Sequence, residues 1–304
     1  MRRFILITYL LLLYFIPANA CEVCGCGVGN YVNGIMPSMK RSFLGIRYRI
    51  AAFNSHIQNG PLFKTSETFQ TYELWYRRQI GNRIQAMLFL PYQHNRQRFY
   101  NGLPEKTING LGDVFLTAAY KLYDQQSKAG DFSVLKQTIW LGGGVKLPTG
   151  KYRFTNTDAE VANPNFQLGT GSFDYLLTAT HTIQLNAWGL QNDLQLRYNS
   201  SNPNQYRFGS RASWQSAVFY TRKRKQSFVP LAGIRAEWVE KDSRQKQQVD
   251  VTGGYQVGML GGLEWQSGQL ALGCRAGLPL KQHLGGGNLQ EKPNLAVHFT
   301  YFLN

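Results

Sequence analysis

The sequence lacks an apolar run long enough to cross a bilayer as a helix. Its longest such run, Phe4 to Ile16, holds about 13 residues, whereas a transmembrane helix needs about 20. The mean hydropathy is also low, at −0.32. Linkers, low-complexity tracts and internal repeats are absent as well, so nothing in the sequence divides the chain into separate domains. A helical membrane protein and a multi-domain arrangement are therefore disfavoured.

Acidic residues are the other shortage, with 17 Asp and Glu against 33 Lys and Arg and a net charge of +16. Such a charge would indicate nucleic acid as the partner of an intracellular protein. Residues 1–20, however, have the pattern of a secretory signal peptide, with two arginines, the apolar run and the small-residue sequence Ala18-Asn19-Ala20. Since an exported chain does not meet nucleic acid, we expect outer-membrane lipid and lipopolysaccharide as partners instead.

Alternation of apolar and polar residues marks a long series of β-strands. In Gln191 to Asn199, Leu194, Leu196 and Tyr198 alternate with polar residues, which gives one apolar and one polar face. Many glycines and a polar average also suit a β-barrel, because only alternate residues meet lipid. Twelve strands are predicted, at residues 43–53, 71–80, 83–93, 113–123, 135–147, 172–185, 191–199, 207–220, 228–238, 256–266, 269–280 and 294–303.

The lengths of the connections distinguish a membrane barrel from a soluble β-sandwich. Short links follow the second, sixth, eighth and tenth strands, and long links follow the first, third, fifth, ninth and eleventh. The fourth link, Asp124 to Val134, is out of line, and the seventh, Ser200 to Tyr206, is intermediate. Outer-membrane barrels have short periplasmic turns and long outer loops. We therefore predict an all-β fold, a single antiparallel up-and-down transmembrane β-barrel of about 12 strands over residues 40–304, in the cell outer membrane with both termini periplasmic.

Aromatic residues near the strand ends are typical of the girdles at the two membrane interfaces. The residues concerned are Tyr72, Tyr92, Tyr120, Trp140, Trp188, Tyr198, Tyr220, Trp238, Trp265 and Tyr301.

Four stretches resemble an outer-membrane β-barrel family named for the meta-pathway of phenol degradation. They are GLGDVFLTAAYKLYD from Gly110, GGGVKLPTGKY from Gly142, GTGSFDYLLTATHT from Gly169 and the C-terminal strand AVHFTYFL, and the first three occur in the family's order. The resemblance implies a passive transport or channel role and names no substrate. Barrels of this class commonly end on an aromatic residue that the barrel-assembly machinery recognises, so that machinery is an expected partner. Here Phe302 is followed by Leu303 and Asn304.

If the apolar face of each strand meets lipid, the polar face lines the lumen. Residues predicted to line it are Arg47, Arg49, Glu73, Arg77, Asp193, Arg197, Arg207, Arg211, Arg235, Glu237 and Arg275, and the same phase includes Lys121, Lys136, Lys146, Asp113, Asp174 and Glu264. This excess of basic groups would favour anions in a channel for small solutes. Alternatively, the charges pair across a closed barrel that has a structural or metal-binding role. Twelve strands lie between the filled and the open barrels, so the sequence leaves both hypotheses open.

Signals for catalysis are weak. The histidines are His56, His94, His181, His283 and His298, and neither of the two that fall in predicted strands, His181 and His298, sits in a recognisable nucleophile motif. We expect no enzyme activity, and no cofactor apart from the metal ion considered next.

Cys21, Cys24 and Cys26 form a C-x-x-C-x-C motif in residues 21–39, a segment predicted to precede the barrel in the periplasm. Three hypotheses stay open: a lipid anchor on the first cysteine, a thiophilic metal ion such as Cu(I) or Zn(II), and a disulfide formed in an oxidising compartment. The fourth cysteine, Cys274, shares the apolar phase of its strand and is predicted to face lipid.

Overall fold

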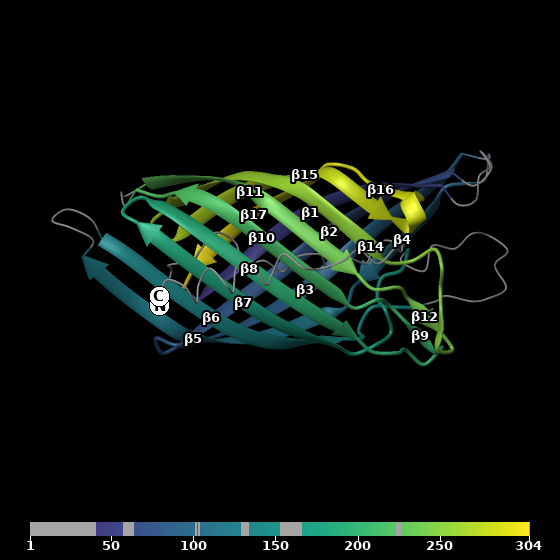
Figure 1. Cartoon of the computed structure of the whole chain (residues 1–304), viewed down its shortest axis with the longest axis horizontal. Coiled ribbons are helices and arrows are strands. Elements are labelled where there is room, and N and C mark those ends of the chain that lie inside the picture. Colours follow the sequence, from purple (N-terminus) through teal and green to yellow (C-terminus); the bar gives the residue numbers. More distant parts are fainter. Residues whose placement is uncertain are drawn as a thin grey trace, which may run out of the picture.

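The computed structural model describes residues 41–56, 64–100, 102, 104–128, 134–152, 166–222 and 226–303. Twelve long antiparallel strands form one sheet that closes on itself, because β14 pairs with β15 and β1 pairs with β17 (Figure 1). These strands are β1 (Phe43–His56), β2 (Lys64–Ile80), β3 (Ile84–Phe99), β5 (Val114–Lys128), β6 (Val134–Leu147), β7 (Asp174–Leu185), β8 (Trp188–Asn199), β10 (Arg211–Tyr220), β11 (Gln226–Val239), β14 (Gly254–Ser267), β15 (Leu270–Leu284) and β17 (Asn294–Phe302). The predicted twelve-stranded barrel is confirmed.

Shorter elements lie at one end of the barrel. β4 (Lys106–Leu111) extends the pairing of β3, and β16 (Leu289–Glu291) lies between β1 and β15 after a short 3-10 helix, Gly285–Gly287. A separate three-stranded sheet contains β9 (Tyr206–Arg207), β12 (Ser243–Arg244) and β13 (Gln247–Gln248). Within the described ranges, no helix has the length and apolar character that a membrane crossing needs.

The connections alternate strictly between the two ends of the barrel. The short-turn end carries the links 81–83, 129–133, 186–187, 221–225 and 268–269, and the loop end carries all the others. The fourth link fits this rhythm because β5 runs on to Lys128 and β6 starts at Val134, so that these two strands project beyond their neighbours (Figure 1). Both Arg41 and Phe302 lie at the short-turn end, where Leu303 N donates to Ser42 O.

Strand ends at the loop end differ most from prediction. β2 begins at Lys64, although residues 54–70 were expected to form a connection. The part of β2 nearest the loop end has polar residues on its outer face, so the sequence shows no alternation of apolar and polar residues there. The expected strand 207–220 is interrupted after Arg207, and β10 starts only at Arg211. Gly209 lies between them, where a Cβ atom would be 1.9 Å from Glu240 O. The chain leaves the sheet at this close contact.

The outer face of the barrel is apolar and carries aromatic residues near both ends. Trp188 and Tyr198 lie on β8 ten residues apart, and each is 59% exposed. At about 3.3 Å per residue and a tilt of about 40°, they are roughly 25 Å apart along the axis, the height of the apolar belt in outer-membrane barrels. The prediction that Trp140 belongs to the aromatic girdle is wrong. Trp140 is half-buried on the inner face of β6, where Lys121 Nζ lies 4.9 Å from the centroid of its ring. Cys274 is exposed, as predicted.

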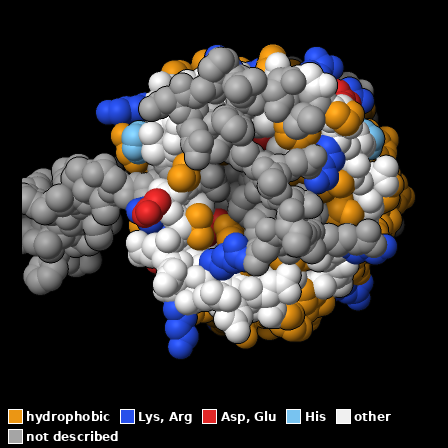
Figure 2. Space-filling view, turned by 90° about the vertical axis from the view of Figure 1, so that its right-hand side faces the viewer, with side chains coloured by type: hydrophobic (Ala, Val, Ile, Leu, Met, Phe, Trp, Pro, Cys, Tyr) orange, Lys and Arg blue, Asp and Glu red, His pale blue; other side chains and the backbone are white. Residues whose placement is uncertain are grey.

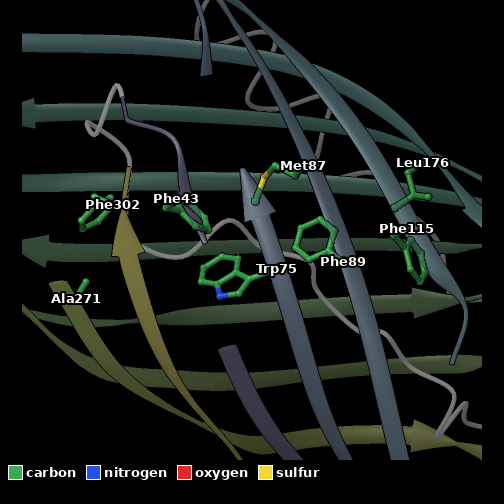
Figure 3. Packing of buried hydrophobic residues seen from close by; sticks show 8 residues of the cluster. All are labelled: Phe43, Trp75, Met87, Phe89, Phe115, Leu176, Ala271 and Phe302. Carbon is green, nitrogen blue, oxygen red and sulfur yellow. The ribbon is translucent and has the colours of Figure 1, made fainter. Parts of the chain in front are cut away.

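The inner face is not uniformly polar. A cluster of buried apolar side chains lies inside the barrel on strands β1, β2, β3, β5, β7, β15 and β17 (Figure 3). Its members are Phe43, Trp75, Met87, Phe89, Phe115, Leu176, Ala271 and Phe302. Sequence reasoning that assigned every apolar residue to the lipid side missed this cluster. The alternation along each strand could have revealed this cluster. Trp75, for example, lies two residues from both Glu73 and Arg77 and therefore shares their inward face of β2.

Candidate functional site in the barrel lumen

A cluster at the loop end brings together three of the stretches that carry the family resemblance. Asp113 comes from the first of these stretches, Lys146 from the second and Asp174 from the third. Lys146 Nζ lies 3.1 Å from Asp113 Oδ2 and 2.5 Å from Asp174 Oδ2, and all three side chains are buried. Asp113 also accepts hydrogen bonds of 2.9 Å from the Gly150 and Thr170 amides. The cluster therefore ties the long connection between β6 and β7 to the start of β5.

Close packing in this cluster requires glycine at position 169. A Cβ atom on Gly169 would lie 2.3 Å from Asp113 Oδ1 and 2.7 Å from Gly150 O. Only a residue without a side chain permits this approach of two chain segments. Gly150 and Gly169 are thus explained by the close approach of their two segments in this cluster.

Residues 166–170 continue from the cluster into the mouth of the barrel. Phe166 and Leu168 are buried, and Gln93 Nε2 donates a hydrogen bond of 3.0 Å to Leu168 O. The Phe166 ring packs against Phe69 of β2, with centroids 6.2 Å apart, in a cluster that also includes residues of β1, β15 and β16. The segment therefore reaches from the β6–β7 side to the opposite strands and narrows the mouth.

Five of the predicted lumen residues pair with one another on the inner phase. Arg47 donates a short hydrogen bond to Glu73, and Arg49 Nη2 lies 3.4 Å from the same carboxylate. Arg211 Nη1 lies 3.1 Å from Glu237 Oε1. Glu73 is completely buried and both guanidinium groups beside it are largely so. These pairs bridge neighbouring strands, as the polar inner face of a narrow barrel requires.

Three more of these residues find other partners. Arg235 Nη2 lies 3.0 Å from Glu291 Oε2, and Arg77 Nη2 donates a hydrogen bond of 3.0 Å to Arg41 O. Asp193 is buried and accepts three side-chain hydrogen bonds. Their donors are Thr180, Gln191 and Gln215, at 2.7, 2.7 and 3.0 Å.

Two inward arginines, Arg197 and Arg275, differ from the others because their side chains form no hydrogen bond or ion pair with the described residues. Arg197 is only 7% exposed, its Nε has no partner, and within the described part of the chain it forms neither a hydrogen bond nor an ion pair. Arg275 has a buried Nη2 without a partner among the described residues. Unpartnered buried polar atoms are uncommon, so each needs an explanation.

Arg207 lies away from the barrel wall. It belongs to β9 in the small sheet, where its Nη1 is 3.2 Å from Glu240 Oε2, so it does not share a strand face with Arg211. The sequence also missed two buried carboxylates, Glu67 and Glu291, because they fall in segments that were expected to be connections. The excess of basic over acidic groups inside the barrel is therefore smaller than the sequence indicated.

A small cavity opens on the inner faces of β3, β5 and β7. Its volume is about 20 Å³, and it is lined by uncharged side chains. They include Gln85, Met87, Phe89, Thr117, Leu176 and Thr178.

A second buried carboxyl group organises the small sheet at the loop end. Asp242 accepts hydrogen bonds from Tyr206 Oη at 2.5 Å and from the Gly209 amide at 2.6 Å. Its own amide donates to Thr252 Oγ1 at 2.8 Å. Burial raises the pKa of Asp242 to about 6, against the lowering effect of these hydrogen bonds and of nearby arginines.

The described residues offer little for metal binding or catalysis. They contain no group of three or more His, Cys, Asp or Glu side chains that could hold a metal ion. His181 shares a hydrogen bond of 2.9 Å with Gln137, and His298 lies 3.6 Å from Glu264. The motif Cys21, Cys24 and Cys26 lies outside the described residues.

A closed antiparallel sheet with an apolar belt outside and paired charges inside defines a transmembrane β-barrel of the outer-membrane type. The family model described as "Putative MetA-pathway of phenol degradation" matches residues 60–269, and the chain belongs to this family.

Solved structures are similar in fold. An outer membrane channel from Pseudomonas putida F1 aligns with a TM-score of 0.59 and 16% identity over 86% of this chain and 96% of that one. The beta domain of the Bordetella autotransporter BrkA aligns with a TM-score of 0.50 and 12% identity over 86% of this chain and all of that one, 100%. No curated protein matched the sequence.

Proposed function

We propose that this protein is a narrow outer-membrane channel that passes small solutes without catalysis and favours anions. The observation that carries the proposal is the inner wall of the closed barrel, where charged and hydroxyl side chains from neighbouring strands lie beside the apolar cluster. The polar part of this wall offers hydrogen-bonding contacts to hydrated solutes. Membership of the family and the fold of the Pseudomonas putida channel support the same function.

The arrangement of the mouth favours small solutes. Residues 166–170 cross toward β2 and narrow the loop end, while the ion pairs of Arg47, Arg49 and Arg211 occupy part of the lumen below. A solute must pass between these groups, so large molecules are excluded.

Preference for anions rests on the arginines that have spare donors. Most inner carboxylates are engaged by a basic or hydroxyl partner, whereas Arg197 has none and Arg275 keeps one free nitrogen among the described residues. A partly unneutralised cation in a low-dielectric wall attracts negative solutes. Because Glu67 and Glu291 add negative charge, we expect the preference to be modest.

The proposed orientation places the short-turn end in the periplasm, together with residues 21–39 once the signal peptide, residues 1–20, has been removed. Outer-membrane barrels keep short turns on that side. The loop end then meets lipopolysaccharide, and its rim displays more Lys and Arg than Asp and Glu side chains in Figure 2. The barrel-assembly machinery is the expected partner of β17, whose Phe299 and Tyr301 face outward.

Single-channel recording in planar bilayers tests this function. We expect small open steps and, in a KCl gradient, a reversal potential that indicates anion preference. Arg197→Gln should shift that potential toward cations, because it removes a cation that no carboxylate of the described residues neutralises. The matched control is Arg96→Gln, a surface residue paired with Glu105, which should leave the potential unchanged. A silent bilayer despite verified insertion contradicts the channel, and cation preference in the unmodified protein contradicts the selectivity.

A further inference from the structure

The small cavity inside the barrel has an unusual neighbour. Its lining of Met87, Phe89, Leu176 and two threonines carries no charge. Figure 3 shows Met87, Phe89 and Leu176 on the inner side of their strands, in the same apolar cluster. Directly across the ladder from Leu176 stands Arg197 of β8, on the same inner phase. Side chains paired in this way have Cβ atoms about 5 Å apart, so Arg197 stands beside one of the residues that line the cavity.

Among the described residues, no carboxylate forms an ion pair with this guanidinium. Arg197 has a second cross-strand neighbour, Arg211, which is itself a cation and is engaged by Glu237. Two like charges directly opposite one another destabilise a sheet. The carboxylates on neighbouring inner positions are already engaged, since Asp174 binds Lys146 and Asp193 accepts three hydrogen bonds. A buried cation in this position is expensive for the empty barrel and would gain from an anionic ligand.

We propose that Arg197 and the adjacent cavity form a binding site for a small organic carboxylate. The guanidinium fork holds the carboxylate through two parallel hydrogen bonds, and the hydrocarbon part lies against Met87, Phe89 and Leu176. An inorganic anion would leave this apolar wall wet, and a neutral solute would leave the arginine unpaired. This inference rests on the proposed channel, because the ligand reaches the site through the lumen.

The size of the cavity limits the ligand. A volume of about 20 Å³ has room for about one water-sized group such as a methyl, so the rest of the molecule extends into the lumen. Short aliphatic monocarboxylates fit this description, whereas dicarboxylates would bring a second charge to an apolar wall.

Calorimetric titration of the purified, detergent-solubilised protein with butyrate tests the site. We expect saturable binding of butyrate and at least tenfold weaker binding of butyramide, which has the same shape without the charge. Formate, which lacks the hydrocarbon part, should also bind more weakly than butyrate. Equal affinities for butyrate and butyramide would overturn the inference.

Two variants and one control assign the binding to Arg197. Arg197→Gln should lower butyrate affinity at least tenfold, and Arg197→Lys, which keeps the charge but loses the planar fork, should lower it less. Arg96→Gln should bind as the unmodified protein does. Circular dichroism verifies the barrel in each case, and the lysine variant keeps the test valid if the glutamine variant misfolds. Undiminished binding by both Arg197 variants would show that the site lies elsewhere.

The same preparations separate this inference from the channel itself. A protein that gives open steps in bilayers but does not bind butyrate contradicts the carboxylate site and leaves the channel standing. If the protein binds butyrate through Arg197 but gives no open steps in bilayers, the channel hypothesis is contradicted and the carboxylate site stands.

Discussion

Two groups of buried charges in this barrel differ in how fully their hydrogen-bonding capacity is used. At the loop end, Lys146 is shared by Asp113 and Asp174, and both carboxylates accept further hydrogen bonds. In the wall between β7 and β10, Arg197 is almost as deeply buried and has no partner among the described residues. Because an unpaired buried charge costs stability, the first group is explained by the fold and the second is not.

The difference indicates which charges are available to a solute. A saturated cluster such as that of Lys146 joins segments of the chain and has nothing left to offer a ligand. An unsaturated group such as Arg197 can improve its interactions only by binding something that enters the lumen. Substitutions should therefore affect stability at the first site and ligand binding at the second.

Removal of Lys146 should have the largest effect on stability. Lys146→Met leaves Asp113 and Asp174 side by side, each less than 5% exposed and without a counter-charge. Breaking a buried pair in this way costs about 3–5 kcal/mol. Denaturant unfolding of the barrel in phosphatidylcholine vesicles measures the loss, and Lys151→Met, at an exposed position nearby, is the control. A loss no greater than that of the control would show that the cluster is not what holds the loop end.

Asp242 provides an intermediate case, in which the hydrogen bonds are present but the charge has no ion pair among the described residues. Its pKa of about 6 lies above the value of 3.8 for an unperturbed aspartate, so the folded state favours the protonated form. The contribution to stability is therefore complete below about pH 4 and is lost as the pH rises through about 6. A shift of this size corresponds to roughly 3 kcal/mol.

Asp242→Asn should remove this pH dependence. The amide can accept from the Gly209 N–H and donate to the Tyr206 hydroxyl, so it reproduces the protonated carboxyl group. We expect the variant to be more stable than the unmodified protein at pH 7.5 and equal to it at pH 4, by denaturant midpoint. The same difference at both pH values would contradict the raised pKa.

Much of the fold could be predicted because the membrane imposes alternation on every strand. Residues such as Leu194 and Leu196 face lipid and are apolar, whereas Asp193 and Arg197, at the alternate positions of the strand, are polar and buried. Beyond the membrane this constraint disappears. The part of β2 before residue 71 and the break after Arg207, which both lie at the loop end, were therefore not predicted. The apolar cluster inside the barrel was not predicted, because residues such as Trp75 and Phe89 are apolar although they lie on the inner face of their strands.

Pairing inside the lumen could not be predicted from the sequence. Phase identifies Glu73 and Arg47 as inward residues, but register decides that they meet. The separation between Asp113 and Asp174 along the chain likewise conceals that one lysine joins them. Arg197 was named as one of many inward arginines, and only the positions of its neighbours reveal that it has no partner in the described part of the chain.

Replacement of Arg197 itself should have the smallest effect on stability. Arg197→Met keeps an extended apolar side chain and removes a buried charge that has no partner among the residues that the structure describes. We expect a change within about 1 kcal/mol, neutral or stabilising, since replacing buried charge by apolar side chains is often favourable. Arg211→Met is the matched comparison on the adjoining strand, because it leaves Glu237 without its guanidinium partner and should be clearly less stable. Unfolding of both variants in the same vesicles decides the matter. A loss at Arg197 equal to that at Arg211 would mean that its charge already serves the fold, and the distinction between saturated and unsaturated groups would fail at the position where it matters most.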